Sequence, residues 1–118
     1  MTDGLASIED FHALDIRVGR VLRVEPNMRA RVPAYIVDVD LGDDLGVRTS
    51  SAQITEAYTP ESLEGRLVLA LVNIPPRRVA GVRSEVLVLG VYSEKGDGPV
   101  VLIGPDEHDR VRPGDRVG

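Results

Sequence analysis

The stretch NIPPRRVAGVRSEVLVLG, residues 73–90, decides how the fold is interpreted. It holds the only Pro-Pro pair and the only Arg-Arg pair of the chain. The apolar run Leu67–Val72 precedes its basic part, and Val86–Val91 follows. Short apolar runs rich in Val and Leu, bounded by Gly or Pro, are typical of buried strands. We therefore predict two core strands joined by a rigid, positively charged connector.

Local patterns predict further strands and two short helices around this stretch. Ser7 with Asp10 three residues later is typical of a capping box, and Thr59 precedes a proline at a first helical position. Apolar and polar residues alternate over Tyr35–Leu41, as in a half-buried strand. Gly19 is expected to form a bulge or a sharp bend in the first strand. The predicted helices are Ile8–Ala13 and Pro60–Leu63, and the predicted strands are Asp15–Val24, Tyr35–Leu41, Val47–Ser51, Arg66–Asn73, Ser84–Tyr92 and Val100–Ile103.

A helix between the third and fourth of five strands is characteristic of the OB-fold. We expect an all-β, five-stranded OB-fold Greek-key barrel with a short N-terminal helix, a helix between strands 3 and 4, and C-terminal additions. At 118 residues we expect one domain, residues 1–118. Only four aromatic residues are present, Phe11 and three tyrosines, so base stacking on aromatic rings is poorly supported.

Composition narrows the class of protein further. The chain lacks cysteine, which excludes disulfides and thiolate chemistry. No apolar run approaches the ~18 residues of a membrane span, and the N-terminus is acidic where an export signal is basic. We therefore expect a cytoplasmic protein without membrane insertion. The net charge is −5, yet residues 17–31 hold five arginines against one glutamate, and residues 77–83 hold three arginines and no acid.

The residues that could carry catalysis or bind a metal lack the required spacing. The acidic segment 38–44 has glycine where a calcium loop needs an oxygen ligand. His12 and His108 have no partner at ligand spacing, and Ser50-Ser51 lacks a nucleophile elbow. We predict no catalytic site, no metal and no cofactor.

The connector is the best candidate for a binding site. Its prolines limit the backbone and pre-organise Arg77 and Arg78, and Gly81 permits a conformation that Ala80 would resist. From the residues alone, a solvated loop and a binding loop both remain open.

The connector resembles the loop of the tRNA-binding domain family, a group of OB-fold proteins. Asn73, Pro76, Arg78, Val79, Gly81 and Ser84 match its pattern in order, and LDIRVGRV (14–21) is similar to its first strand. Four blocks are similar to a branch of small homodimeric proteins regarded as chaperones for protein export. These blocks are SSAQIT (50–55), YTPESLEGR (58–66), PPRRVAG (75–81) and SEVLVLGV (84–91).

The resemblance implies a homodimer that binds unfolded or precursor polypeptides, with the Sec translocase as a further partner. The alternative is a structure-specific tRNA-binding protein. Glu85 beside the connector and the negative net charge favour the polypeptide, because phosphate contacts dominate affinity for nucleic acids. The candidate binding residues are Asn73, Pro76, Arg77, Arg78, Gly81, Arg83, Ser84, Ser50 and Gln53.

Overall fold

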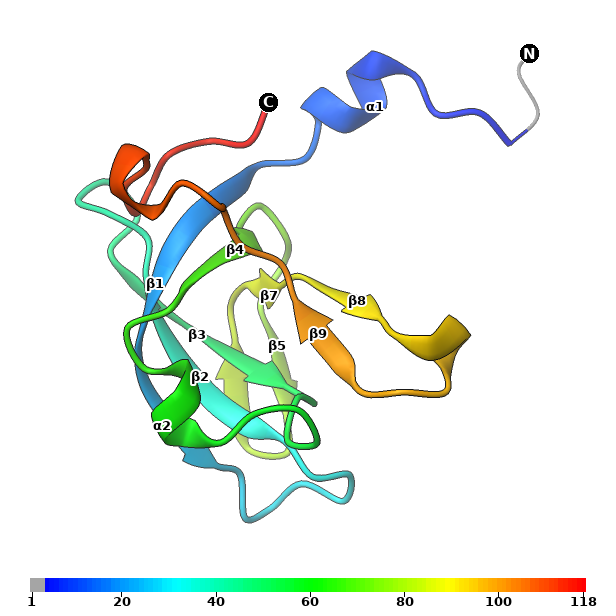
Figure 1. Cartoon of the computed structure of the whole chain (residues 1–118), viewed down its shortest axis with the longest axis vertical. Helices are drawn as coiled ribbons and strands as arrows, with labels where there is room; N and C mark the ends of the chain where they lie inside the picture. Colours follow the sequence, from blue (N-terminus) through cyan, green and yellow to red (C-terminus); the bar gives the residue numbers. More distant parts are fainter. Residues whose placement is uncertain (1–3) are drawn as a thin grey trace.

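A five-stranded antiparallel sheet, in the order β3-β2-β1-β4-β7, curls into a nearly closed barrel in the computed structural model (Figure 1). The structure describes residues 4–118; residues 1–3, part of the acidic N-terminus considered above, lie outside it. The barrel strands are β1 (Ile16–Pro26), β2 (Tyr35–Asp40), β3 (Val47–Ala52), β4 (Leu67–Leu71) and β7 (Leu87–Val88). The predicted OB-like barrel is confirmed.

Two small sheets and four short helices complete the described residues 4–118. The sheets pair β5 (Arg77–Val79) with β6 (Val82–Ser84), and β8 (Gly90–Tyr92) with β9 (Val100–Leu102). The helices are α1 (Ile8–His12), α2 (Pro60–Leu63) and the 3₁₀ turns η1 (Glu94–Gly96) and η2 (His108–Arg110). No helix within residues 4–118 is long and apolar enough to cross a membrane.

The predicted alternation of β2 builds one wall of the core. Tyr35, Val37 and Val39 are buried, and Leu41 just beyond the strand is fully buried. Tyr35 donates its hydroxyl to the Tyr58 carbonyl at 2.7 Å, so its one polar atom is satisfied inside the barrel.

Both predicted helix caps are present. Ser7 and Asp10 exchange side chain–backbone hydrogen bonds, as do Thr59 and Ser62. The helix α2 closes one end of the barrel with Leu63, whose side chain has no exposed surface. By contrast, none of the five residues of α1 is buried, and α1 extends away from the barrel (Figure 1).

The bulge of β1 lies at Leu22, because the register with β2 shifts between Val21 and Arg23. Of the two alternatives predicted for Gly19, the bulge is therefore wrong. Gly19 is required for packing instead, since a Cβ atom there would come within 2.4 Å of the Val39 side chain and 2.9 Å of the Leu41 side chain. A glycine in a strand can mark close approach as well as a bulge.

The predicted strand Ser84–Tyr92 is divided into β6, β7 and β8, because the chain leaves the barrel at Leu89. There the Leu89 nitrogen donates to the Leu69 carbonyl at 2.8 Å, and the Ile103 nitrogen donates to the Leu89 carbonyl at 3.2 Å. This junction turns β8 and β9 outward as a separate hairpin. In Figure 1 this hairpin and α1 project from the same side of the barrel.

The C-terminal segment is held against β1. The Gly114 nitrogen donates to the Val18 carbonyl at 2.7 Å, and the Val117 nitrogen donates to the Ile16 carbonyl at 2.8 Å. Asp15 accepts hydrogen bonds from the Arg17 guanidinium beside this contact. These bonds hold the pKa of the Asp15 carboxyl below its usual value, although partial burial opposes them.

Candidate functional site

The connector between β4 and β7 is a β-hairpin and not an irregular loop. Arg77 pairs with Ser84, Arg78 with Arg83, and Val79 with Val82. The turn consists of Ala80 and Gly81, which have φ values of 46° and 84°. Positive φ at both central residues fits a two-residue turn that matches the twist of a hairpin. Ala80 therefore adopts the conformation that we expected it to resist.

The hairpin presents two different faces. Val79, Val82 and Ser84 are half-buried, and the Ser84 hydroxyl accepts a hydrogen bond from the Ser51 nitrogen of β3 at 3.1 Å. Arg78 and Arg83 lie directly opposite each other and are exposed. Like charges in directly opposed positions destabilise a strand pair. This pairing is therefore not expected to stabilise the hairpin, and it concentrates positive charge on the exposed face.

A fourth arginine reaches the hairpin from the loop between β1 and β2. The Arg29 guanidinium packs on Gly81, where a Cβ atom would lie 2.4 Å from its terminal nitrogen. Asn27, which is buried, accepts a hydrogen bond from the Arg29 nitrogen at 3.1 Å and so fixes this loop. Four arginines thus lie on or against the hairpin, with Arg78 and Arg83 on one face, Arg77 on the other face and Arg29 on the turn, and we name these four the basic cluster.

An apolar groove of about 400 Å³ borders this cluster. Its lining comes from β3, the following loop, the basic hairpin and the β7–β8 segment. Leu87, which is 48% exposed, lies in this groove, and Arg77 contributes its charged side chain. The main apolar contributors are Ala52, Ile54, Val79, Leu87 and Leu89, and we name this surface the apolar groove.

The remaining binding residues predicted from the sequence lie outside the basic hairpin, in different surroundings. Gln53 lines the apolar groove and is exposed, and Pro76 is exposed immediately before β5. Asn73 bonds the segment before β1: its side chain accepts from the Asp15 nitrogen and donates to the Ala13 carbonyl, both at 2.8 Å. Ser50 is 1% exposed, so a ligand on the surface does not reach its side chain.

Glu85 lies at the seam where the barrel closes. Its nitrogen donates to the Thr49 carbonyl at 2.8 Å, and its carboxylate accepts from the Thr49 nitrogen at 3.2 Å. The carboxylate therefore has a structural partner on β3. Within residues 4–118, no three His, Asp or Glu side chains gather in an arrangement that could hold a metal ion.

A family model described as a putative tRNA-binding domain matches residues 16–116. The chain belongs to the tRNA-binding domain family. Its basic hairpin and apolar groove both lie within the matched residues of this domain.

Comparison with solved structures shows similarity over nearly the whole chain. The chaperone CsaA from Bacillus anthracis str. Ames is 47% identical, with a TM-score of 0.87, covering 98% of this chain and 100% of that one. The CsaA chaperone protein from Picrophilus torridus is 38% identical, with a TM-score of 0.88, covering 97% and 100%.

Among curated relatives, the methionine–tRNA ligase of Archaeoglobus fulgidus is 43% identical over 111 residues, which is 94% of this chain. The chain spans only 16% of the length of that ligase. The tRNA-binding domain is thus shared between small proteins called chaperones and one segment of a much longer enzyme.

The sequence did not predict that Arg29 would join the basic hairpin of the tRNA-binding domain. The two are about 50 residues apart, and the buried Asn27 links them, since its side chain accepts from the Arg29 nitrogen at 3.1 Å and donates to the Ala80 carbonyl at 3.5 Å. The excess of arginine over residues 17–31 was visible, but nothing in the sequence indicated which of these arginines faces the hairpin.

Proposed function

We propose that this tRNA-binding domain is a homodimeric, CsaA-like chaperone of the cytoplasm that binds unfolded or precursor polypeptides for export. The observation that carries the proposal is the apolar groove beside the arginine cluster. An apolar groove takes up side chains of varied shape, and the arginines bind carboxylates and backbone carbonyls without demanding one sequence. The similarity to two CsaA proteins over their full length supports this choice.

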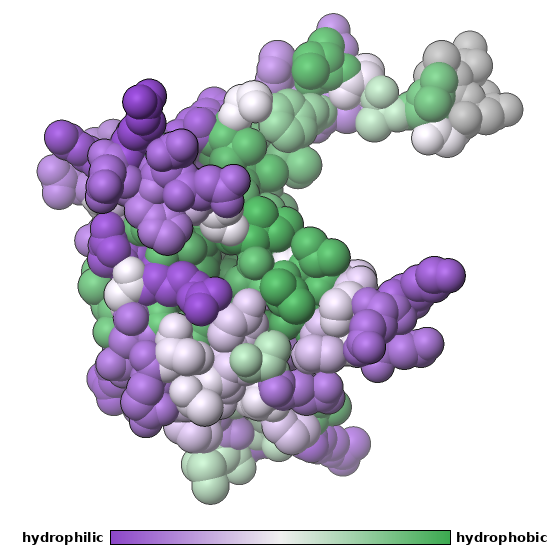
Figure 2. Space-filling model, viewed as in Figure 1, coloured by the Kyte–Doolittle hydropathy of each residue, from purple (hydrophilic) through white to green (hydrophobic). Residues whose placement is uncertain are grey.

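Dimerisation in this proposal uses the face between α1 and the β8–β9 hairpin. Figure 2 shows an apolar surface in the hollow between these two projections. Leu5 and Ile8 on the α1 side are 70% and 62% exposed, and Val91 and Tyr92 on β8 are 52% and 79% exposed. A second copy of this chain would remove these side chains from water, which is the main driving force of association. Light scattering of the purified protein should give twice the chain mass, and a monomer at micromolar concentration would contradict the dimer.

The second candidate is tRNA binding, and the pairing of Arg78 with Arg83 favours it. Forked arginine donors suit phosphate groups, and opposed arginines concentrate positive charge on one face of the hairpin. Glu85 weighs less against RNA than the sequence suggests, since its carboxylate is engaged by Thr49.

A salt titration separates the two candidates. The protein is mixed with tRNA and, separately, with a reduced unfolded polypeptide. A tRNA complex should weaken linearly in log affinity against log salt, with a slope of about −0.9 for each phosphate neutralised in a duplex. The affinity for the polypeptide should fall much less steeply with salt, because only its contacts with the arginines are screened and those with the apolar groove are not. Suppressed aggregation of the polypeptide without a tRNA complex at low salt supports the chaperone; the reverse result overturns it.

Two variants locate the site. Arg77→Ala combined with Arg78→Ala should weaken either ligand, whereas Arg112→Ala, an exposed arginine outside the cluster, is the matched control. If the double variant retains both activities, the basic cluster is not the site. The Sec translocase as recipient of bound precursors is tested by crosslinking it to the chaperone–precursor complex. Absence of a crosslink would remove that partner from the proposal.

A further inference from the structure

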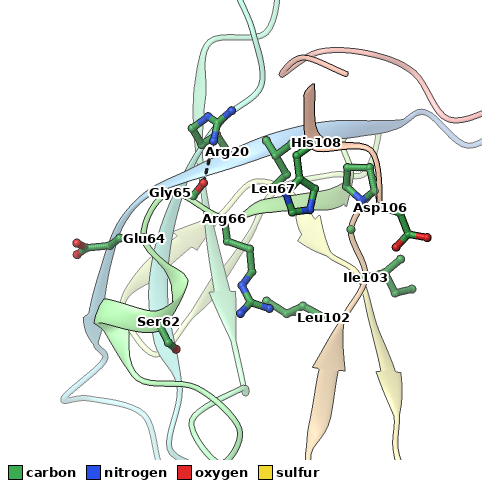
Figure 3. Close-up of a pocket in the computed structure, with 12 residues that line it drawn as sticks. Arg20, Ser62, Glu64, Gly65, Arg66, Leu67, Leu102, Ile103, Asp106 and His108 are labelled. Carbon is green, nitrogen blue, oxygen red and sulfur yellow. Dashed lines mark hydrogen bonds between the residues drawn. The ribbon is translucent and has the colours of Figure 1, made fainter. Parts of the chain in front are cut away.

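A second pocket lies away from the basic hairpin and has no part in the proposed function. It is about 560 Å³ in volume and lies between β1, the turn from α2 into β4, and the segment from β9 to η2. Figure 3 shows its residues, among them Arg20, Arg66 and His108. A volume of roughly 300–1,000 Å³ is usual for a small-molecule site.

Two basic side chains of this pocket, those of Arg66 and His108, face the same space (Figure 3). Arg66 extends toward its centre, and the His108 ring turns toward the same space above Leu67 (Figure 3). The carboxylates of Glu64 and Asp106 turn away from it (Figure 3). Although acids and bases are both present in the lining, the centre of the pocket therefore favours a negative charge.

Arg66 is held in position before any ligand arrives. Its guanidinium carbon lies 5.0 Å from the centre of the Tyr58 ring, a cation–π contact. The Tyr58 hydroxyl accepts a hydrogen bond from the Leu102 nitrogen at 2.9 Å, which fixes the ring. The Arg66 carbonyl accepts from the Val21 nitrogen at 2.9 Å, which ties its backbone to β1. A pre-organised donor loses less entropy when it binds.

Backbone contacts also hold Arg20 and the segment that carries His108. Arg20 donates to the Gly65 carbonyl at 2.8 Å, which keeps its guanidinium at the edge of the pocket opposite the Arg66 guanidinium (Figure 3). Gly104 lets the segment before His108 approach β4 closely, because a Cβ atom there would lie 2.6 Å from the Leu67 carbonyl oxygen. Among the described residues 4–118, neither Arg20 nor Arg66 nor His108 forms an ion pair with a carboxylate.

We propose that this pocket binds a small ligand that carries a phosphate group, such as a mononucleotide. Arg66 supplies a forked donor for the phosphate oxygens, and His108 supplies a second donor group. The apolar side chains of Leu67, Leu102 and Ile103 provide a surface for the flat body of the ligand. The phosphate can come from a free nucleotide or from the 5′ end of an RNA strand.

The test is an NMR titration of the labelled protein with AMP, adenosine and inorganic phosphate. AMP should shift the resonances of residues 64–67 and 102–108 in a saturable manner, and adenosine should bind about tenfold more weakly or worse. Arg66→Gln and, independently, His108→Ala should each weaken AMP binding about tenfold. Arg112→Gln is the matched control and should bind AMP like the original protein.

Three results would overturn the site: no shift at about 5 mM AMP, equal binding of AMP and adenosine, or AMP affinity unchanged in both the Arg66 and the His108 variant. An oligonucleotide with and without a 5′ phosphate identifies the source. If only the phosphorylated strand shifts the same resonances, an RNA end is accepted; if neither strand does while AMP binds, the ligand is a free nucleotide. Both of these results support the phosphate site. Polypeptide binding in the apolar groove is measured separately, so failure of one proposal leaves the other standing.

Discussion

The barrel interior buries its apolar side chains, whereas the periphery leaves several apolar side chains exposed. Inside, Leu41, Leu63, Val39 and Val68 have no exposed surface. Outside, α1 buries none of its residues, the β8–β9 hairpin exposes Val91 and Tyr92, and the basic hairpin opposes two arginines. The buried residues of the interior stabilise the folded barrel. Residues at the periphery lower the stability of an isolated chain, so they are better explained by partners that cover them.

The largest effect should come from the interior. Leu63→Ala removes a fully buried side chain that closes the end of the barrel, and should cost about 3 kcal/mol of unfolding free energy. Urea denaturation measures this loss. The matched control Leu22→Ala, where the leucine is 48% exposed, should cost less than about 1 kcal/mol. Equal losses would break the distinction between interior and periphery.

Gly19→Ala should cost about 1–3 kcal/mol, because its methyl group would overlap the Val39 side chain. The paired variant Gly19→Ala with Val39→Ala sharpens the test, since a smaller residue at position 39 makes room for the methyl group. The double variant should lose less stability than the sum of the single variants. Strict additivity would show that Gly19 is not required for packing against β2.

Features that depend on neighbouring residues could be predicted from the sequence, whereas contacts between distant strands could not. The caps at Ser7 and Thr59 and the alternation of β2 depend on neighbouring residues only, and all three were predicted. The role of Gly19 depends on a strand that follows 20 residues later, so its local pattern gave the wrong prediction.

The candidate site was predictable to a similar degree. The arginines of the connector were identified because they lie next to one another. The hairpin, the contribution of Arg29 and the apolar groove arise from contacts between distant segments. For the same reason the sequence did not show that Ser50 faces the core or that Asn73 bonds the segment before β1.

The stability that the Asp15–Arg17 ion pair contributes to the folded protein should depend on pH. The Arg17 hydrogen bond lowers the pKa of Asp15 in the folded protein. The unfolded chain therefore takes up this proton first as the pH falls, so the stabilisation is present above about pH 4 and is lost below it. The loss should be at most about 1 kcal/mol, because both side chains are partly exposed. Asp15→Asn should remove this part of the acid dependence measured by urea unfolding; an unchanged dependence contradicts the assignment.

The smallest effect should come from the basic hairpin. Arg78→Thr removes one of two opposed charges and introduces a residue that favours strands, so stability should rise by a few tenths of a kcal/mol. Ligand binding should fall at the same time. Thermal unfolding and a binding assay on the same sample measure both, with Arg112→Thr as control. A loss of stability would show that the arginine pair is structural.

The most direct test of the central claim is the fluorescence anisotropy of a labelled, reduced and unfolded polypeptide titrated with the original protein and with Leu87→Asp. Leu87 is 48% exposed in the apolar groove, so the barrel should tolerate the change. We predict saturable binding to the original protein and at least about tenfold weaker binding to the variant, because a carboxylate in the groove loses its hydration when the polypeptide covers it. Absence of saturable binding, or equal affinity for both proteins, would contradict the apolar groove as the polypeptide site.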